Sequence, residues 1–135
     1  MSDQTRRVEY RYVEVDDKPG AGARVFSALE QQGVSLLSMT AFPKSAGKAQ
    51  IDLVVSSGDL EKAAAKAGLK LSPKKQALFV RGEDRPGAVA AIFKKLGEAR
   101  VNVIAANAAC GQSGFGLILW VKPSDLDAAA KALGA

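Results

Sequence analysis

The spacing of apolar residues in the first half of the chain changes at turn-forming residues, and this predicts a series of short elements. Residues 8–15 are rich in valine and tyrosine and run into an Asp-Asp-Lys-Pro-Gly segment, so we expect a strand and then a turn. Residues 22–29 carry apolar side chains at helical spacing, and Gly33 is placed to end that helix. A second strand is expected over residues 34–42.

The pattern then switches back to strand, helix and strand. Residues 49–55 alternate apolar with polar side chains, as a half-buried strand does. Residues 57–59 offer an N-cap for a helix over residues 60–67, and Gly68 is placed to end it. The apolar pair in residues 69–71 is long enough for a short fourth strand. The first half therefore predicts the order βαββαβ.

The second half repeats this pattern but stops earlier. We expect a strand over residues 77–82, a helix with an apolar stripe that starts at Val89, and strands over residues 101–110 and 115–122. A glycine-rich hairpin connects these last two strands, and Ser124 is placed to cap a final helix. No fourth strand follows, so the strand over residues 77–82 is predicted to be an unpaired edge.

The two halves align with one offset of 67 residues and no gap, which indicates a tandem repeat. We place the two copies at residues 1–73 and 74–135. The fold class is then α+β, with two ferredoxin-like βαββαβ modules, the second lacking its last strand. The identical pairs that carry the repeat include Val13 with Val80, Asp17 with Asp84, Pro19 with Pro86, Gly20 with Gly87, Phe26 with Phe93, Leu29 with Leu96, and Ile51 with Ile118.

The composition argues against several classes of function. The chain has 135 residues, 47% of them apolar, with no histidine and one cysteine, so the usual zinc, haem and imidazole-based sites lack their ligands and we expect no metal or cofactor. No nucleophile is paired with a base, so we expect no enzyme. The net charge of +5 is spread along the chain without interleaved aromatics, which predicts a solvated surface and no nucleic-acid partner. The absence of a long apolar run predicts a soluble protein without a membrane partner, and the single cysteine, which allows no disulfide framework, favours a cytoplasmic setting.

The repeated loop is the best candidate for binding chemistry. In each copy a strand ends near an aspartate, a Pro-Gly pair follows, and a helix begins. The free backbone N–H groups and the dipole of that helix favour a carboxylate or phosphate, and glycine lets a ligand approach the backbone. Asp17 or Asp84 beside it is suited to an ammonium group, so the loop fits an amino acid. The alternative is that the aspartates only complement their helix N-termini while the glycines only turn the chain.

A known family shares this loop and its surroundings. Residues of the second copy resemble the signature of the ACT domain, a small amino-acid-sensing module attached to enzymes such as aspartokinase and phosphoglycerate dehydrogenase. The residues that carry the resemblance are Asp84, Arg85, Pro86, Gly87, Ala88, Val89, Phe93 and Leu96, together with residues 101–104. It implies the ferredoxin-like fold and covers nearly the whole chain as two modules.

The resemblance also implies where a ligand lies. In effector-binding ACT domains the ligand sits between the loop after the first strand of one module and the second-strand region of another. The matching positions are Asp84, Gly87, Ala88, Val89 and Asn102 in the second copy, and Asp17, Gly20, Ala21, Gly22 and Ser35 in the first. Because Ser35 stands opposite Asn102 and Gly22 opposite Val89, the two loops are expected to bind differently, and we favour the second.

Three other residues have weaker claims. Asn107 is in reach of a ligand or simply solvated, Cys110 is a redox thiol or, as we prefer, a small buried filler, and Trp120 is expected in the core or an interface. Residues 117–121 are apolar on both faces, which favours cover from the other copy or, as we prefer, from a second chain in a homodimer. The leading hypothesis is a regulatory protein that binds a small amino acid and signals to a partner enzyme or regulator. The alternative is an ACT protein that acts only in assembly.

Overall fold

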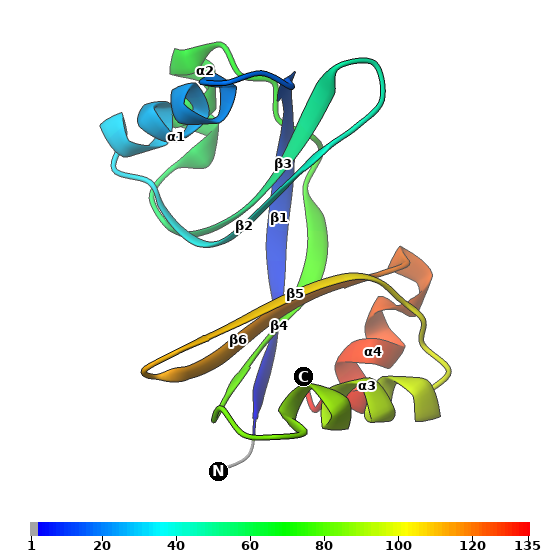
Figure 1. Cartoon of the computed structure of the whole chain (residues 1–135). Coiled ribbons are helices and arrows are strands. Elements are labelled where there is room, and N and C mark those ends of the chain that lie inside the picture. Colours follow the sequence, from blue (N-terminus) through cyan, green and yellow to red (C-terminus); the bar gives the residue numbers. More distant parts are fainter. Residues whose placement is uncertain (1–2) are drawn as a thin grey trace. The chain divides into compact units, whose positions relative to one another are not determined.

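The computed structural model describes residues 3–135, which fall into two compact units (Figure 1). Unit A comprises residues 9–75, and unit B comprises residues 3–8 together with residues 76–135. Both have an α+β architecture of antiparallel strands with helices, and the described part of the chain holds four α-helices in all. None of the helices in residues 3–135 is both long enough and apolar enough to cross a membrane.

Unit A is a three-stranded sheet with two helices. Its elements are β1 (Gln4–Asp16, of which residues 9–16 belong to this unit), α1 (Ala21–Gln31), β2 (Ser35–Pro43), β3 (Lys48–Ser57) and α2 (Leu60–Ala67). The strand order is β2-β3-β1, with both pairings antiparallel. The predicted helices and the three long strands are therefore confirmed, with ends shifted by a few residues.

Local chemistry explains where the helices of unit A begin and end. Asp59 caps α2, because its carboxylate accepts the backbone N–H of Lys62 at 3.0 Å. Gly33 and Gly68 follow the two helices with positive φ angles of 68° and 69°, a conformation that glycine adopts without strain. The core under these helices is built from a few large side chains of the sheet and of α1: Val13, Ile51, Leu53, Val25 and Leu29.

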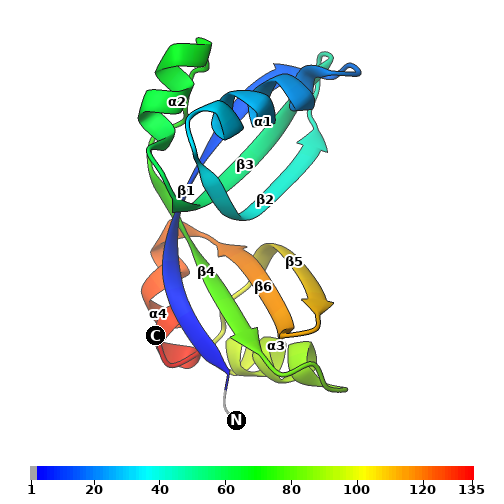
Figure 2. The same ribbon diagram turned by 90° about the vertical axis from the view of Figure 1, so that its left-hand side faces the viewer.

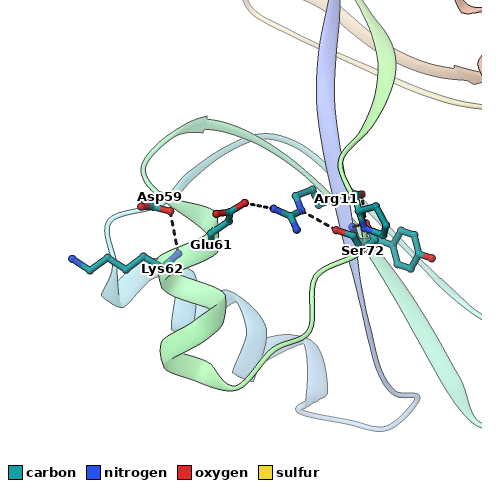
Figure 3. Close-up of polar contacts among 7 residues, drawn as sticks. Arg11, Asp59, Glu61, Lys62 and Ser72 are labelled. Atoms are coloured by element: carbon teal, nitrogen blue, oxygen red, sulfur yellow. Dashed lines mark hydrogen bonds and ion pairs between the residues drawn. The ribbon is translucent and has the colours of Figure 1, made fainter.

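The short strand predicted over residues 69–71 does not form, because its backbone is engaged elsewhere. The N–H of Leu69 donates to the carbonyl of Ala64 at the end of α2, and Pro73 has no N–H to give. Ser72 alone replaces the strand: its N–H donates to the Tyr12 carbonyl, and its Oγ accepts the Tyr12 N–H, both at 2.9 Å. We call this pair of hydrogen bonds between Ser72 and Tyr12 the Ser72 clasp. Arg11 of β1 stabilises it, because its guanidinium donates to the Ser72 carbonyl at 2.9 Å and to the Glu61 carboxylate at 2.6 Å (Figure 3).

Unit B is a four-stranded sheet with two α-helices. It contains β4 (Lys75–Gly82), α3 (Ala88–Glu98), β5 (Val103–Gly111), β6 (Gly114–Val121), a 3-10 turn (Pro123–Asp125) and α4 (Leu126–Ala132). The hairpin of β5 and β6 is confirmed, with Gly111 opposite Gly114. In the core, side chains of α3 and α4 cover β4 and β6; the main contributors are Leu78, Val80, Ile92, Leu96, Leu117, Leu119, Ala129 and Ala130.

The prediction that the strand over residues 77–82 is an unpaired edge is wrong. β4 lies between β6 and β1, and the residues of β1 that belong to unit B are 4–8 (Figure 2). The strand order of this unit is therefore β1-β4-β6-β5. β1 begins at Gln4, four residues before the expected start, and this extension supplies the position that the second copy leaves empty.

Two smaller expectations change as well. Ser124 does not cap the last helix, because Pro123 first forms the 3-10 turn and α4 begins only at Leu126, after Asp125. Trp120 is buried as expected, and so is Ile118 beside it on the same face of β6.

Removal of the Ser72 hydroxyl is predicted to lower the free energy of unfolding by a measurable amount. In Ser72→Ala the Tyr12 N–H loses its side-chain acceptor at a buried position, and we expect unfolding to cost about 1–3 kcal/mol less than in the parent. Urea unfolding followed by circular dichroism measures this difference. Ser124→Ala, at an exposed serine that caps nothing, is the matched control and stays within about 0.5 kcal/mol of the parent. Equal stability of the two variants would contradict the role assigned to the clasp.

Candidate ligand-binding site

The two repeated loops place a glycine at the start of a helix. Gly20 precedes α1 and Gly87 precedes α3, with φ angles of 88° and 85°, and neither helix start receives a side-chain hydrogen bond. Neither Asp17 nor Asp84 is therefore a helix cap. The N–H of Ala21 donates to the Lys18 carbonyl at 3.3 Å and that of Ala88 to the Arg85 carbonyl at 3.2 Å. The next N–H groups of a first helical turn have no partner within the helix, so both starts still present donors and positive dipole ends.

In unit B this helix start opens onto a cavity of about 360 Å³. Its volume lies within the usual range for small-molecule sites. One side is the loop and first turn of α3, and the other is the end of the β5–β6 hairpin. The lining residues are Asp84, Arg85, Gly87, Ala88, Val89, Ala90, Ala108, Ala109, Cys110 and Phe115.

The cavity combines an apolar wall with a small charged rim. Ala108, Ala109 and Phe115 form the wall, whereas the only charged residues among those that line the cavity are Asp84 and Arg85. The Arg85 guanidinium donates through Nη1 to the Glu83 carbonyl at 3.2 Å and to the Asp3 carboxylate at 3.3 Å. An acid, a free helix start and an apolar wall thus face the same space.

Cys110 is exposed, so the prediction that it is a buried filler is wrong. The residue lies near the end of β5, where the side chains of this edge strand are exposed. It also lines the cavity of unit B. The single thiol of the chain is therefore a natural reporter of whether this cavity is occupied.

Asn102 does not line this cavity. It is an exposed residue between α3 and β5, whereas Gly87 lies at the other end of α3. A helix of 11 residues is about 16 Å long, so the two positions of one unit are too far apart to hold one small ligand. Ser35 stands in the same relation to Gly20 across α1, and Asn107 of β5 is exposed without lining the cavity.

The equivalent loop of unit A opens onto a cavity of about 600 Å³ with a different character. Gly20 and Ala21 line it, but Asp17, Gly22 and Ser35 do not. The aspartate that faces this cavity is Asp16. The charged lining residues are Glu14 and Asp16 against Lys18, Arg24, Lys48 and Lys70.

Asp16 is tied to the basic side of that lining. Its carboxylate accepts from Lys48 Nζ at 2.7 Å and lies 3.9 Å from Lys18 Nζ. The hydrogen bond from Lys48 lowers the pKa of Asp16, and the charges of Lys48, Lys18 and Arg24 lower it further. Asp16 therefore stays ionised at neutral pH, and the unit A cavity carries four basic and two acidic groups.

Strand register explains the cavity residues that sequence patterns missed. Phe115 of β6 pairs with both Gly82 of β4 and Cys110 of β5, so the hairpin ends where the loop after β4 begins. This brings residues 108–110 next to residues 84–90. The glycine-rich turn was visible in the sequence, but its position beside the loop depends on which strands pair. Arg85 was visible only as part of the family motif.

Comparison with known proteins identifies the fold. No protein-family model matches the chain, and no curated protein matches its sequence. The structure is similar to protein BT0572 from Bacteroides thetaiotaomicron, with a TM-score of 0.83 and 14% identity over 96% of this chain and 88% of that one. It is also similar to the ligand-free regulatory subunit of aspartate kinase from Thermus thermophilus, with a TM-score of 0.67 and 15% identity over 99% and 95% of the two chains.

The regulatory subunit of aspartate kinase from Thermus flavus gives a comparable match, with a TM-score of 0.62 and 16% identity over 99% and 95%. At these identities the likeness shows the fold alone. It is compatible with the ACT-like, ferredoxin-like α+β architecture expected from the sequence.

Gly87, at the start of α3, is predicted to be required because of its backbone conformation and not because a larger side chain would clash. A methyl group at Gly87 would touch nothing within 4 Å, but its φ of 85° strains any other residue, so Gly87→Ala should destabilise by about 1–2 kcal/mol. Gly97 lies inside the same helix with equally open surroundings, so Gly97→Ala should stabilise by about 0.5–1 kcal/mol. Urea unfolding of both variants tests the pair, and the same sign of change in both would contradict it.

Proposed function

We propose that this chain is a non-catalytic regulatory protein made of two ACT-like modules in tandem, which binds a small amino acid at the cavity of unit B. The observation that carries the proposal is the meeting of Asp84, the uncapped start of α3 and an apolar wall around one cavity. The modules correspond to residues 1–73 and 74–135 of the sequence repeat. In space, β1 starts in unit B and continues into unit A.

The chemistry of the cavity assigns each part of the ligand a partner. The α-carboxylate lies at the start of α3, where the backbone N–H groups of the first turn and the helix dipole attract an anion. The ammonium group lies against Asp84. The side chain packs on Ala108, Ala109 and Phe115, which favours a small apolar one. Gly87, Ala88 and Val89 then form the backbone floor of the site.

The remaining predicted positions require another module. Asn102 and Ser35 are exposed and lie one helix length from the loop of their own unit, so they reach a ligand only from another module. The proposed homodimer provides one. β5 is an edge strand of nine residues without a charge, and Ile104 on it is 58% exposed, whereas edge strands that stay single are usually guarded by charges. A second copy that pairs along β5 also covers Val89 and Phe93 of α3, which are exposed.

In this proposal the amino acid is a signal and not a substrate. Binding at a module interface changes the populations of two arrangements of the dimer, and a partner enzyme or regulator in the cytoplasm senses the difference. The similarity in fold to regulatory subunits of aspartate kinase supports a regulatory role. An ACT protein that acts only in assembly is the alternative, and the same exposed edge of β5 favours it.

Protection of Cys110 tests the proposal. We expect one or a few small amino acids to slow modification of this thiol by a disulfide reagent, about tenfold at ten times the dissociation constant, because the thiol lines the cavity. Asp84→Asn should abolish the protection, which is measured as the ratio of each variant's modification rates without and with ligand. Asp17→Asn, at the equivalent exposed residue of unit A that lines neither the unit A cavity nor the unit B cavity, is the control and should retain protection.

The outcome separates the two functions. Protection that depends on Asp84 supports an amino-acid sensor. Unchanged modification rates with all twenty amino acids, in a protein that sediments as a dimer, would leave the assembly role.

A further inference from the structure

The N-terminal residues of the chain reach the rim of the unit B cavity. Strand β1 begins at the same end of the unit as the loop that follows β4 (Figure 2). Asp3, just before β1, places its carboxylate oxygen Oδ1 3.3 Å from Nη1 of Arg85, which lines the cavity. The Asp3 side chain is 16% exposed and that of Arg85 is 42% exposed, so the acid is the more enclosed partner.

The position of Asp3 is fixed by the packing around it. A side chain at Gly82 would overlap the Asp3 carboxylate and come within 2.9 Å of the Phe115 ring. Because Gly82 has no side chain, the Asp3 carboxylate and the Phe115 ring both fit there. Further along β1, Arg6 lies 5.7 Å above the Phe79 ring and Arg7 pairs with Asp127 of α4 at 2.8 Å. These contacts hold the start of β1 on unit B, so Asp3 is presented to Arg85 by a paired strand.

This contact changes the charge that a ligand meets. Asp84 and Arg85 alone would make the rim neutral, but Asp3 pairs with the guanidinium through Nη1 and brings the summed charge of these three residues to one negative charge. The same Nη1 also donates to the Glu83 carbonyl, so a ligand would meet the guanidinium through its other nitrogens, beside the charge of Asp3. A second carboxylate on a ligand would have to displace Asp3 from Arg85 or lie beside it, and like charges at short range repel.

We propose that Asp3 is a specificity-determining residue of the unit B cavity, which disfavours acidic amino acids by offsetting the charge of Arg85. The inference rests on the proposed function of that cavity and adds a ligand class to it. Amino acids with uncharged side chains are accepted, and aspartate and glutamate are disfavoured relative to their amides. The N-terminal segment thereby contributes to a ligand site formed 80 residues later in the chain, around Asp84 to Val89.

The test compares isosteric acid and amide ligands in matched variants of the full chain. Dissociation constants of glutamate, glutamine, aspartate and asparagine are measured from protection of Cys110. Asp3→Asn removes the negative charge beside Arg85, whose guanidinium then pairs more readily with a ligand carboxylate, so the preference for amide over acid should fall by about 1.4- to fivefold, the range measured for exposed ion pairs. Asp127→Asn removes the other ion pair that anchors the same segment, at a residue that does not line the cavity, and should leave the preference unchanged.

The possible outcomes lead to different conclusions. A reduced preference in Asp3→Asn alone supports the assignment. No gain in binding of the acids relative to their amides in Asp3→Asn, with amino acids still protecting the parent, overturns the role of Asp3 and leaves the proposed function standing. An equal reduction in Asp127→Asn would show that anchoring of the segment matters and not the charge at Asp3, and it overturns the assignment as well. No protection by any amino acid in any variant refutes the proposed function and the inference together.

Discussion

The structure depends on the pairing of one long strand with two partners. β1 has 13 residues; those from Arg11 onward pair with β3 in unit A, and residues 4–8 belong to unit B, where β1 adjoins β4. Unpaired backbone groups inside a sheet are costly, so a repeat without its own last strand needs one from elsewhere. The start of the chain provides it. The same strand ends at Asp16 in the lining of one cavity, and its first residues bring Asp3 to the other.

Most of the fold could be predicted from residue patterns, since helices and long strands depend on local periodicity and on glycine and aspartate at their ends. The failures concern pairing between distant segments. Residues 4–7 are polar and give no strand signal, yet they are part of β1. The fourth strand expected at residues 69–71 was judged by its apolar side chains, whereas the N–H of Leu69 is used by the C-terminus of α2.

In the candidate site, too, the residues close together in the sequence could be predicted, and those brought in by strand pairing could not. Asp84, Gly87, Ala88 and Val89 are contiguous in sequence, and the structure brings them together at one cavity. The apolar wall and Cys110 come from a hairpin whose place is set by the register of β4 and β6, which no local pattern reveals. The alignment of the two copies also pointed to the wrong acidic residue in unit A. Asp17 is the residue that aligns with Asp84, but Asp16, which accepts a hydrogen bond from Lys48, lines the cavity.

Native-state hydrogen exchange, measured by NMR on the full chain, tests most directly whether the start of β1 is a strand of unit B. If the start of β1 is an integral strand of unit B, amides of residues 4–8 that face β4 should exchange slowly. They should also lose protection at the same denaturant concentration as β4 itself. Exchange of residues 4–8 at the rate of an unstructured peptide, while β4 and β6 remain protected, would contradict the account, because β4 would then be an edge and Asp3 would not be held at Arg85.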